Sequence, residues 1–466
     1  MYRTLTIIIL FLVTADFSEA QIQTVKYLSS KELAGRLPGH TGYTKAANFI
    51  ANEFAKLKLK PGGNNCYFQN FKIEYNEILA PEHFSVICKN KKINYQLGTD
   101  YVYRGFTGAG KFITNVVFCG YGLSEPDSAY DDYTGIDVKN KIALVFKYNP
   151  KWKNFPNGYP REKAITAAKH GAVGILFVSF PNDPVPQKLI GSVLHGSGEQ
   201  MTDFPQIHIE LHVVDKLFES SGFTLKQLQS VIDSTRKPFS VPLENKVDLE
   251  VHTKYEKEKE VPNVVGILEG GDSVLKNEYI ILGAHLDHVG NQAGKIFFPG
   301  ANDNASGSAA VLEAARKFVS LKEKPKRSVI FVLFASEEQG LNGSSYFADH
   351  MSSVKAMINL DCIGYGDSIQ VNGGKSFPDL WKIVKEIDMK NDKLLVSRTG
   401  NGVGADAEPF FKKGIPTLYF VTTNSYQHLH LLSDTWETIN QKLLEAVTRL
   451  SFLTAIEMCN KQNLKK

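Results

Sequence analysis

The C-terminal half of the chain alternates between two patterns of apolar positions. Continuous apolar runs rich in β-branched residues predict buried strands at residues 264–268, 279–283, 328–334, 356–360 and 417–421. Apolar residues three to four positions apart predict intervening helices at residues 306–321, 343–350, 377–388 and 438–456. Strands that alternate with helices favour an α/β fold with a mixed, mainly parallel sheet sandwiched by helices.

The pattern changes at about residue 100. Before this point, residues 25–59 carry a helical signature with a Gly- and Pro-punctuated loop, and residues 71–96 alternate like paired strands. Residues 100–254 then hold short apolar runs separated by turns, which predicts an inserted β-rich domain. The α/β domain would therefore be discontinuous and comprise residues 21–99 and 255–466.

Residues 1–20 have the pattern of a secretory signal peptide. Arg3 precedes an apolar stretch at residues 5–14, and small residues before Gln21 form an A-x-A-like cleavage site. The stretch is shorter than the ~20 residues of a spanning helix. We expect export to the periplasm or the medium, removal of the leader and no membrane association afterwards, with an uncleaved anchor as the alternative.

Composition narrows the range of partners and cross-links. A net charge of +4 on 466 residues gives no reason to expect nucleic acid or an anionic membrane as a partner.

The charged run at residues 254–260 indicates a linker that returns to the α/β domain, with a solvated surface strand as the alternative. The five cysteines form no dense framework, although Cys66 and Cys88 could pair.

Most of the predicted strands of the C-terminal half run into imidazole or carboxylate groups. These groups are His285, Asp287, Glu337, Glu338, Asp361 and His430, and Asp303 stands in a Gly-flanked loop before a predicted helix. Functional side chains collect at the carboxyl ends of strands in open α/β sheets. Because so many carboxylates at one edge would repel one another, a bound divalent metal is the natural compensation.

Five sequence blocks resemble, in order and spacing, the signature blocks of the double-zinc exopeptidases, metallopeptidase family twenty-eight. The blocks are GAHLDHVG, GANDNASG, FASEEQGLNGS, NLDCIG and HLHLLSDT. That family includes leucyl aminopeptidases and glutamate carboxypeptidases. The inserted segment resembles a protease-associated domain through its CGYGLS and AAKHGAVGILFV stretches. Any one block is a weak signal, whereas the five together are specific.

The resemblance implies two Zn²⁺ ions per chain and assigns their ligands. His285 and Asp361 would hold one zinc, Glu338 and His430 the other, and Asp303 would bridge both. Two cations ~3.5–4 Å apart need an anionic bridge, and Asp303 can supply it.

Other acidic and imidazole groups receive supporting roles from the same resemblance. Asp287 would orient His285, and Glu337 would act as the general base. His288 and His428 each neighbour a ligand but are expected at the surface or in a supporting position. Asp406 corresponds to an aspartate of a loop that supports the site. Two positions depart from the family pattern, because Leu432 and Ala407 stand where a proline and a histidine are usual.

The resemblance implies an exported zinc-dependent exopeptidase, most simply an aminopeptidase acting on peptides, with the inserted domain limiting substrate size. A carboxypeptidase of the same fold is an alternative and would need a cation for the substrate's terminal carboxylate, for which Arg398 is a candidate. A glutaminyl cyclase, which uses one zinc, is a second alternative. A non-catalytic binding protein, as the transferrin receptor is in this superfamily, is the third. Such a relative is expected to have lost ligands or the base, and this sequence retains them.

Overall fold

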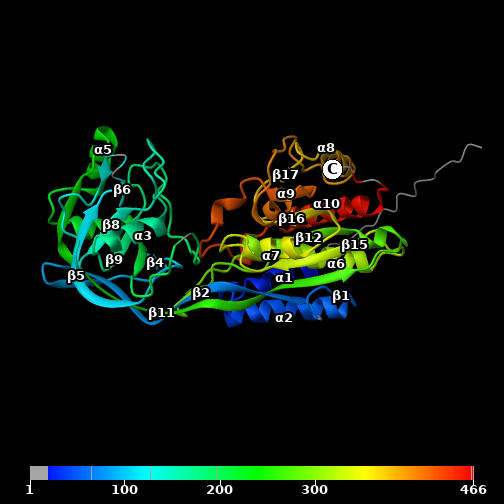
Figure 1. Cartoon of the computed structure of the whole chain (residues 1–466), viewed down its shortest axis with the longest axis horizontal. Helices are drawn as coiled ribbons and strands as arrows, with labels where there is room; N and C mark the ends of the chain where they lie inside the picture. Colours follow the sequence, from blue (N-terminus) through cyan, green and yellow to red (C-terminus); the bar gives the residue numbers. More distant parts are fainter. Residues whose placement is uncertain are drawn as a thin grey trace, which may run out of the picture.

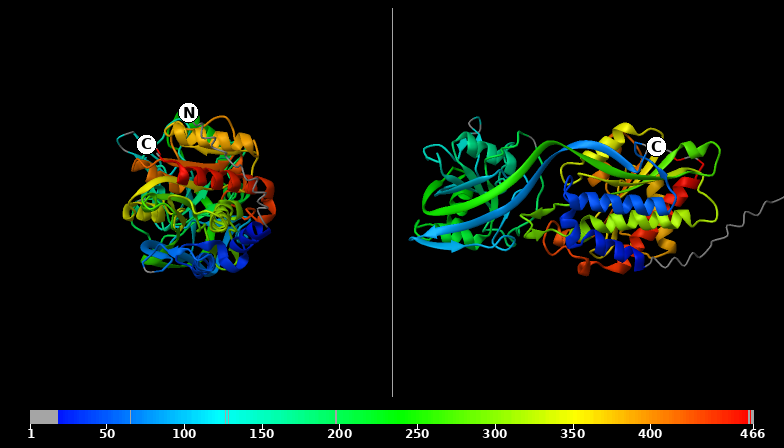
Figure 2. Two further views of the ribbon diagram at one scale, coloured as in Figure 1. Left: turned by 90° about the vertical axis from the view of Figure 1, so that its right-hand side faces the viewer. Right: turned by 90° about the horizontal axis from the view of Figure 1, so that it is seen from below.

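A computed structural model describes residues 19–64, 66–125, 127, 129–196, 198–462 and 464, and shows two lobes joined by a long ribbon of two strands (Figure 1). The strands are β2 (Phe68–Cys88) and β11 (Ser240–Leu268), which pair antiparallel along their length and pass from one lobe to the other (Figure 2). Residues 1–18, which include most of the predicted leader, lie outside the described residues.

The larger lobe is built on the predicted α/β sheet. Its strand order is β17-β18-β16-β12-β15-β11, in which β18, β16, β12 and β15 are parallel and the two outer strands antiparallel. The bounds are β12 Tyr279–His285, β15 Ser328–Phe334, β16 Val354–Leu360, β17 Ile369–Asn372 and β18 Thr417–Thr422. Every residue of β15 is buried, as expected for a central strand covered on both faces.

Helices cover both faces of this sheet, which confirms the predicted sandwich. Alternate residues of each strand enter different cores: Leu282 and Phe331 pack with α1, α2, α6, α8 and α10, while Ile281 and Ile330 pack with α7 and α9. The bounds are α1 Glu19–Leu28, α2 Thr41–Lys56, α6 Gly307–Val319, α7 Asn342–His350, α8 Pro378–Lys390, α9 Glu408–Lys412 and α10 Gln441–Asn460. None of the helices in the described part of the chain is long and apolar enough to span a bilayer.

The smaller lobe has its own core, and its strands continue the sheet of the larger lobe through β11. Strands β5, β8, β9 and β10 are parallel, and β4 pairs antiparallel with β10. The bounds are β3 Lys91–Asn94, β4 Tyr101–Tyr103, β5 Gly110–Cys119, β8 Ile142–Phe146, β9 Gly174–Val178, β10 Gln206–Ile209, α3 Pro160–Lys169, α4 Leu211–Phe218 and α5 Leu225–Thr235. Short strands complete the structure: β1 Lys60–Pro61, β6 Ser124–Glu125, β7 Tyr130–Asp131, β13 Asn291–Gln292 and β14 Ile296–Phe297.

The passage between the lobes differs from the expected linker. The charged run at residues 254–260 is part of β11 and pairs with β2, so the linker interpretation was wrong and the surface strand is correct. Its charges pair across and along the ribbon, as Glu258 does with Lys72 at 2.7 Å. The core of the smaller lobe also includes Phe84 and Leu97, before residue 100, because the far half of β2 belongs to its sheet.

All five cysteines are free, so the possible pair between Cys66 and Cys88 is not formed. Cys66 is exposed, and the other four are buried among apolar side chains. They therefore serve as small apolar core residues.

Candidate active site

The structure brings all seven predicted site residues to one edge of the larger sheet. His285 ends β12, Glu337 and Glu338 follow β15, and Asp361 follows β16. Three overlapping groups of potential metal ligands form there among the described residues, with ligand atoms within 4.8 Å of one another. One group is His285, Glu337 and Asp361, the second is His288, Asp303, Glu338 and His430, and the third joins Asp303, Asp361 and Cys362. The rule that parallel strands present their carboxyl ends together accounts for this convergence.

Asp303 lies between the first two groups and contacts both. Its Oδ1 is 3.3 Å from Nε2 of His285, which is also 3.4 Å from Oδ1 of Asp361. Its Oδ2 is 3.2 Å from Nε2 of His430, which is also 2.9 Å from Oε2 of Glu338. Each oxygen of one carboxylate therefore faces a separate imidazole–carboxylate pair.

Asp434, to which the sequence assigned no role, holds the backbone of this central carboxylate. Its Oδ1 accepts a hydrogen bond from the Asn302 N–H at 2.9 Å, and its Oδ2 accepts one from the Asp303 N–H at 3.0 Å. Burial raises the pKa of Asp434 to about 7. The SDT triplet that follows His430 was the only sequence signal for this contact.

We expect Asp434→Asn to weaken metal binding by about 10- to 100-fold, the usual cost of losing a residue that orients a ligand. The substitution replaces one acceptor by an amide donor that opposes a backbone N–H. Metal affinity is measured by competition with a chromogenic chelator. Asp349→Asn is the matched control, since Asp349 forms an exposed ion pair with Lys413. Equal affinities in both variants would contradict the role.

Asp287 contacts both His285 and the backbone of the two glutamates. The nearest acceptor to Nδ1 of His285 is the backbone carbonyl of Asp287, at 3.2 Å, and the Asp287 carboxylate lies at 3.8 Å. That carboxylate accepts hydrogen bonds from the N–H groups of Glu337 at 3.2 Å and Glu338 at 3.4 Å. Asp287 therefore fixes the turn that carries both glutamates as well as the imidazole.

The charge balance of the site fits a divalent cation. Although burial opposes it, hydrogen bonds with His285 and His430 hold the pKa of Asp303 well below its usual range. Burial also opposes ionisation of Glu338, but the charge of His430 and its imidazole partners lower the pKa of Glu338 to about 2. Burial opposes the charged form of His285 and His430, but the neighbouring carboxylates raise the pKa of both imidazoles well above the usual value. The imidazole protons thus supply positive charge that a bound metal would replace.

Unsatisfied polar atoms lead to the same conclusion. Oδ1 of Asp361 and Nε2 of His288 are buried and have no hydrogen-bond partner among the described residues. Imidazole nitrogens together with carboxylate oxygens suit a metal of borderline hardness. The residues present therefore fit a zinc-type cation.

Glu337 differs in its environment from Asp303 and Glu338, whose pKa values are lowered. Burial raises the pKa of Glu337 well above its usual range, the charge of His285 opposes this rise, and the neighbouring charge of Glu338 adds to it. A carboxyl group with a raised pKa beside potential metal ligands has the properties of a proton acceptor and donor.

His288 and Arg36 are site residues whose importance the sequence did not show. A surface position was one expectation for His288, and it was wrong: the side chain is fully buried, with Nδ1 2.9 Å from Oε1 of Glu338. Arg36 is also fully buried and donates to the carbonyls of Leu286, Pro299 and Gly300, each at 2.8 Å. Arg36 therefore ties together the two loops that carry His288 and Asp303.

The remaining expected residues lie in three different places. His428 lies outside the ligand groups, with Nδ1 2.9 Å from the Ser433 hydroxyl. Asp406 is buried, and burial raises its pKa to about 7 against the opposing charge of His285. Arg398 is exposed and does not line the cavity at the metal site.

The cavity that reaches the metal site lies between the lobes. Its volume is about 460 Å³, and its walls include Glu338 and His430 from the larger lobe and Arg104 and Ser192 from the smaller one. The Gly191 N–H donates to the His430 carbonyl at 2.8 Å, so the smaller lobe directly contacts a ligand-bearing loop.

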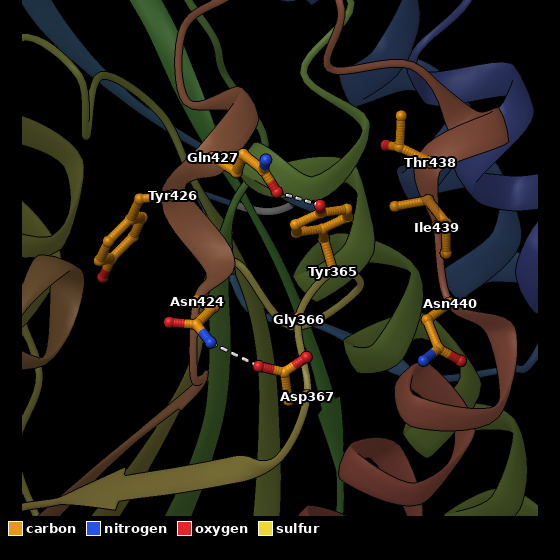
Figure 3. Close-up of a pocket in the computed structure, with 9 residues that line it drawn as sticks. All are labelled: Tyr365, Gly366, Asp367, Asn424, Tyr426, Gln427, Thr438, Ile439 and Asn440. Atoms are coloured by element: carbon orange, nitrogen blue, oxygen red, sulfur yellow. Dashed lines mark hydrogen bonds between the residues drawn. The ribbon is translucent and has the colours of Figure 1, made fainter. Parts of the chain in front are cut away.

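A larger hollow, of about 810 Å³, lies beside Tyr365 and Asp367 (Figure 3). None of the residues that line it belongs to the potential ligand groups. It approaches them only through Tyr426, whose hydroxyl is 3.2 Å from that of Tyr419, which in turn lies 3.5 Å from Oδ2 of Asp361. The smaller cavity is therefore the candidate substrate site.

Comparison with known proteins agrees with this geometry. Residues 263–455 match the model of peptidase family M28, and residues 112–217 match that of the PA domain. The larger lobe therefore resembles a peptidase domain of family M28. The matched PA residues lie within the predicted insertion and in the smaller lobe, so the expected family resemblance and its inserted domain are confirmed.

The curated relatives of this chain are distant in sequence. An aminopeptidase of Pseudomonas aeruginosa is 25% identical over 369 residues, which cover 77% of this chain and 60% of the relative. A glutamate carboxypeptidase 2 homolog of Caenorhabditis elegans is 24% identical over 421 residues, which cover 71% of this chain and 51% of the relative. The chain therefore spans between half and three fifths of the length of these relatives.

Solved structures confirm the fold of both lobes together. A peptidase M28 precursor from Shewanella amazonensis superposes with a TM-score of 0.68 at 19% identity, covering 96% of this chain and 94% of its own. The zinc aminopeptidase BSAP from Bacillus subtilis gives a TM-score of 0.63 at 21% identity, covering 96% of each chain.

Proposed function

We propose that this chain is a zinc-dependent exopeptidase that removes N-terminal residues from peptides. The observation that carries the proposal is the position of Asp303, whose two oxygens face separate imidazole–carboxylate pairs. Its relatives support the direction of cleavage, since several are named aminopeptidases.

The chain offers ligands for two zinc ions. We infer that His285 and Asp361 hold one ion, Glu338 and His430 hold the other, and Asp303 bridges them. When bound, zinc polarises a carbonyl group and lowers the pKa of water in the site to ~7.

Glu337 performs the proton transfers in this proposal. Its carboxylate takes a proton from the attacking water and delivers it to the nitrogen of the leaving amine. Asp287 fixes the position of Glu337, because it accepts the Glu337 N–H. The burial of Glu337 favours the protonated form that the second transfer requires.

The smaller lobe restricts the substrate to a chain end. The candidate cavity is bounded by both lobes, and the hydrogen bond from Gly191 to His430 closes one side beside the metal ligands. An extended chain with residues on both sides of the scissile bond would meet this contact. We also propose export, on the strength of the leader pattern in residues 1–20.

The test is amino-acid release from a small panel of substrates, with and without a chelator and with zinc restored afterwards. The panel combines reporters with N-terminal Leu, Lys, Ala and Gln and N-blocked peptides with a free C-terminus. We expect release from the N-terminal end only, abolished by the chelator and recovered with zinc. Release from the N-blocked peptides alone would contradict the proposal and indicate a carboxypeptidase. Cyclisation of Gln without hydrolysis would indicate a glutaminyl cyclase.

A further inference from the structure

Arg104 is a buried cation that has no anionic partner among the described residues. It follows β4, is 7% exposed and lines the cavity between the lobes. Its Nε and Nη1 atoms are buried without a hydrogen-bond partner, and the nearest aromatic ring, that of Phe106, lies 5.4 Å from the guanidinium carbon. Among the described residues, no carboxylate oxygen approaches this guanidinium within 4.0 Å.

The other buried arginines of the described chain are all satisfied. Arg36 donates to backbone carbonyls. Arg161 donates to the carbonyls of Gly196 and Gly198, both at 2.6 Å, and Arg327 pairs with Glu278 at 2.7 Å. Since a buried charge is costly unless it is paired and hydrogen-bonded, the unpaired state of Arg104 needs a functional explanation.

Two further basic side chains lie near Arg104. Lys147, at the carboxyl end of β8, is buried and donates to the side chain of Gln187 at 2.5 Å. His208, on β10, is buried with Nδ1 unpartnered. Burial lowers the pKa of Arg104 to about 10, and burial together with the charge of Arg104 lowers the pKa of Lys147 well below its usual value. Since a low pKa favours the neutral form of Lys147, Arg104 is the member of this cluster that can pair with an anion.

We propose that the Arg104 guanidinium binds a carboxylate of the substrate on the leaving-group side of the scissile bond, a role that rests on the proposed function. The N-terminal residue of a substrate ends at the metal site, so the part that extends across the cavity is the leaving group. A cavity of about 460 Å³ is the size of a small-ligand site and suits a short peptide. Arginine matches a carboxylate with two parallel hydrogen bonds.

Two sources could supply this carboxylate. One is the free C-terminus of a di- or tripeptide, and the other is the side chain of an acidic residue after the scissile bond. Both give the same chemistry at Arg104. They predict different preferences, because only the first makes the enzyme selective for very short peptides.

The test compares wild type, Arg104→Gln, Arg104→Lys and Arg398→Gln on four substrates: Leu-Gly-Gly, its C-terminal amide, the amide of Leu-Glu-Gly, and leucine p-nitroanilide. Arg398 is the matched control because it is exposed and outside the cavity. We expect KM of the wild type to be about 10- to 100-fold lower for a carboxylate-bearing peptide than for Leu-Gly-Gly amide, the usual effect of a charge-assisted hydrogen bond. Arg104→Gln should abolish this difference at unchanged kcat, and Arg104→Lys should keep part of it.

Hydrolysis of leucine p-nitroanilide, which has no carboxylate, tests the proposed function separately. If the wild-type protein lacks this activity, the affinities of Leu-Gly-Gly and of its amide, measured by calorimetry, still test the inference. A preference for Leu-Gly-Gly alone identifies the C-terminus as the source, and a preference for Leu-Glu-Gly amide identifies the side chain. Equal KM values in wild type, a preference that survives Arg104→Gln, or a marked loss of thermal stability in that variant would each overturn the inference.

Discussion

Replacing Glu337 with alanine is expected to lower kcat by about 10³-fold while the zinc content of the protein stays unchanged. Glu337 is a half-buried carboxyl group with a raised pKa among the potential ligands, and Asp287 holds its backbone in place. Removing a proton acceptor affects the chemical step, whereas removing a ligand would release metal. Steady-state kinetics and elemental analysis of the purified protein measure the two effects together.

The same experiment separates the base from a ligand. Glu337 lies within 4.8 Å of ligand atoms on His285 and Asp361, so a direct bond to metal is the competing role. A loss of zinc in proportion to activity would contradict the assignment to proton transfer. Glu408→Ala is the matched control, because Glu408 pairs with Lys412 at the surface, and we expect it to leave both quantities unchanged.

Arg36→Met is expected to lower the free energy of unfolding by about 3–5 kcal/mol, the size of effect seen when a buried charged network loses one member. The substitution keeps an unbranched apolar stem but leaves the carbonyls of Leu286, Pro299 and Gly300 without donors. It also removes a cation near the buried acidic groups, whose charges counter the lowering of the Arg36 pKa by burial.

Urea unfolding of the metal-free and zinc-loaded protein measures this effect. The metal-free protein is essential, because bound ligand stabilises the native state and would mask part of the loss. Arg398→Met, at an exposed position, should change stability by less than about 0.5 kcal/mol. An unfolding midpoint of Arg36→Met equal to that of wild type would show that the loops hold their positions without this side chain.

The central strands could be predicted well from the sequence because a strand that is buried on both faces consists of a continuous run of apolar residues. The run predicted at 328–334 coincides with β15. The ribbon is the opposite case: residues 254–260 are charged because their strand is exposed, so only pairing with β2 reveals it as a strand. β17 was not predicted, since a short antiparallel edge strand of Ile369–Asn372 alternates buried and half-buried positions over too few residues to form a pattern.

The site shows a similar division. Residues that follow a strand, such as His285 and Asp361, could be predicted because the strand fixes where their side chains collect. Arg36 could not, because the carbonyls of Leu286, Pro299 and Gly300, which it binds in the site loops, are separated from it by 250 or more residues. The case of Arg104 is harder still, since its distinguishing property is a missing partner, and that becomes visible only when the surrounding side chains have been placed.

The ribbon between the lobes also constrains the order in which the chain can fold. β2 and β11 are distant in sequence, and closing so long a loop before other contacts form is entropically unfavourable. Folding of the smaller lobe brings Ile87 beside Lys246, after which pairing can advance one residue at a time towards Phe68 and Val264. Since the Val264 end pairs with β15, we expect the smaller lobe to act as the folding nucleus of the ribbon and the edge of the larger lobe's sheet to be completed last.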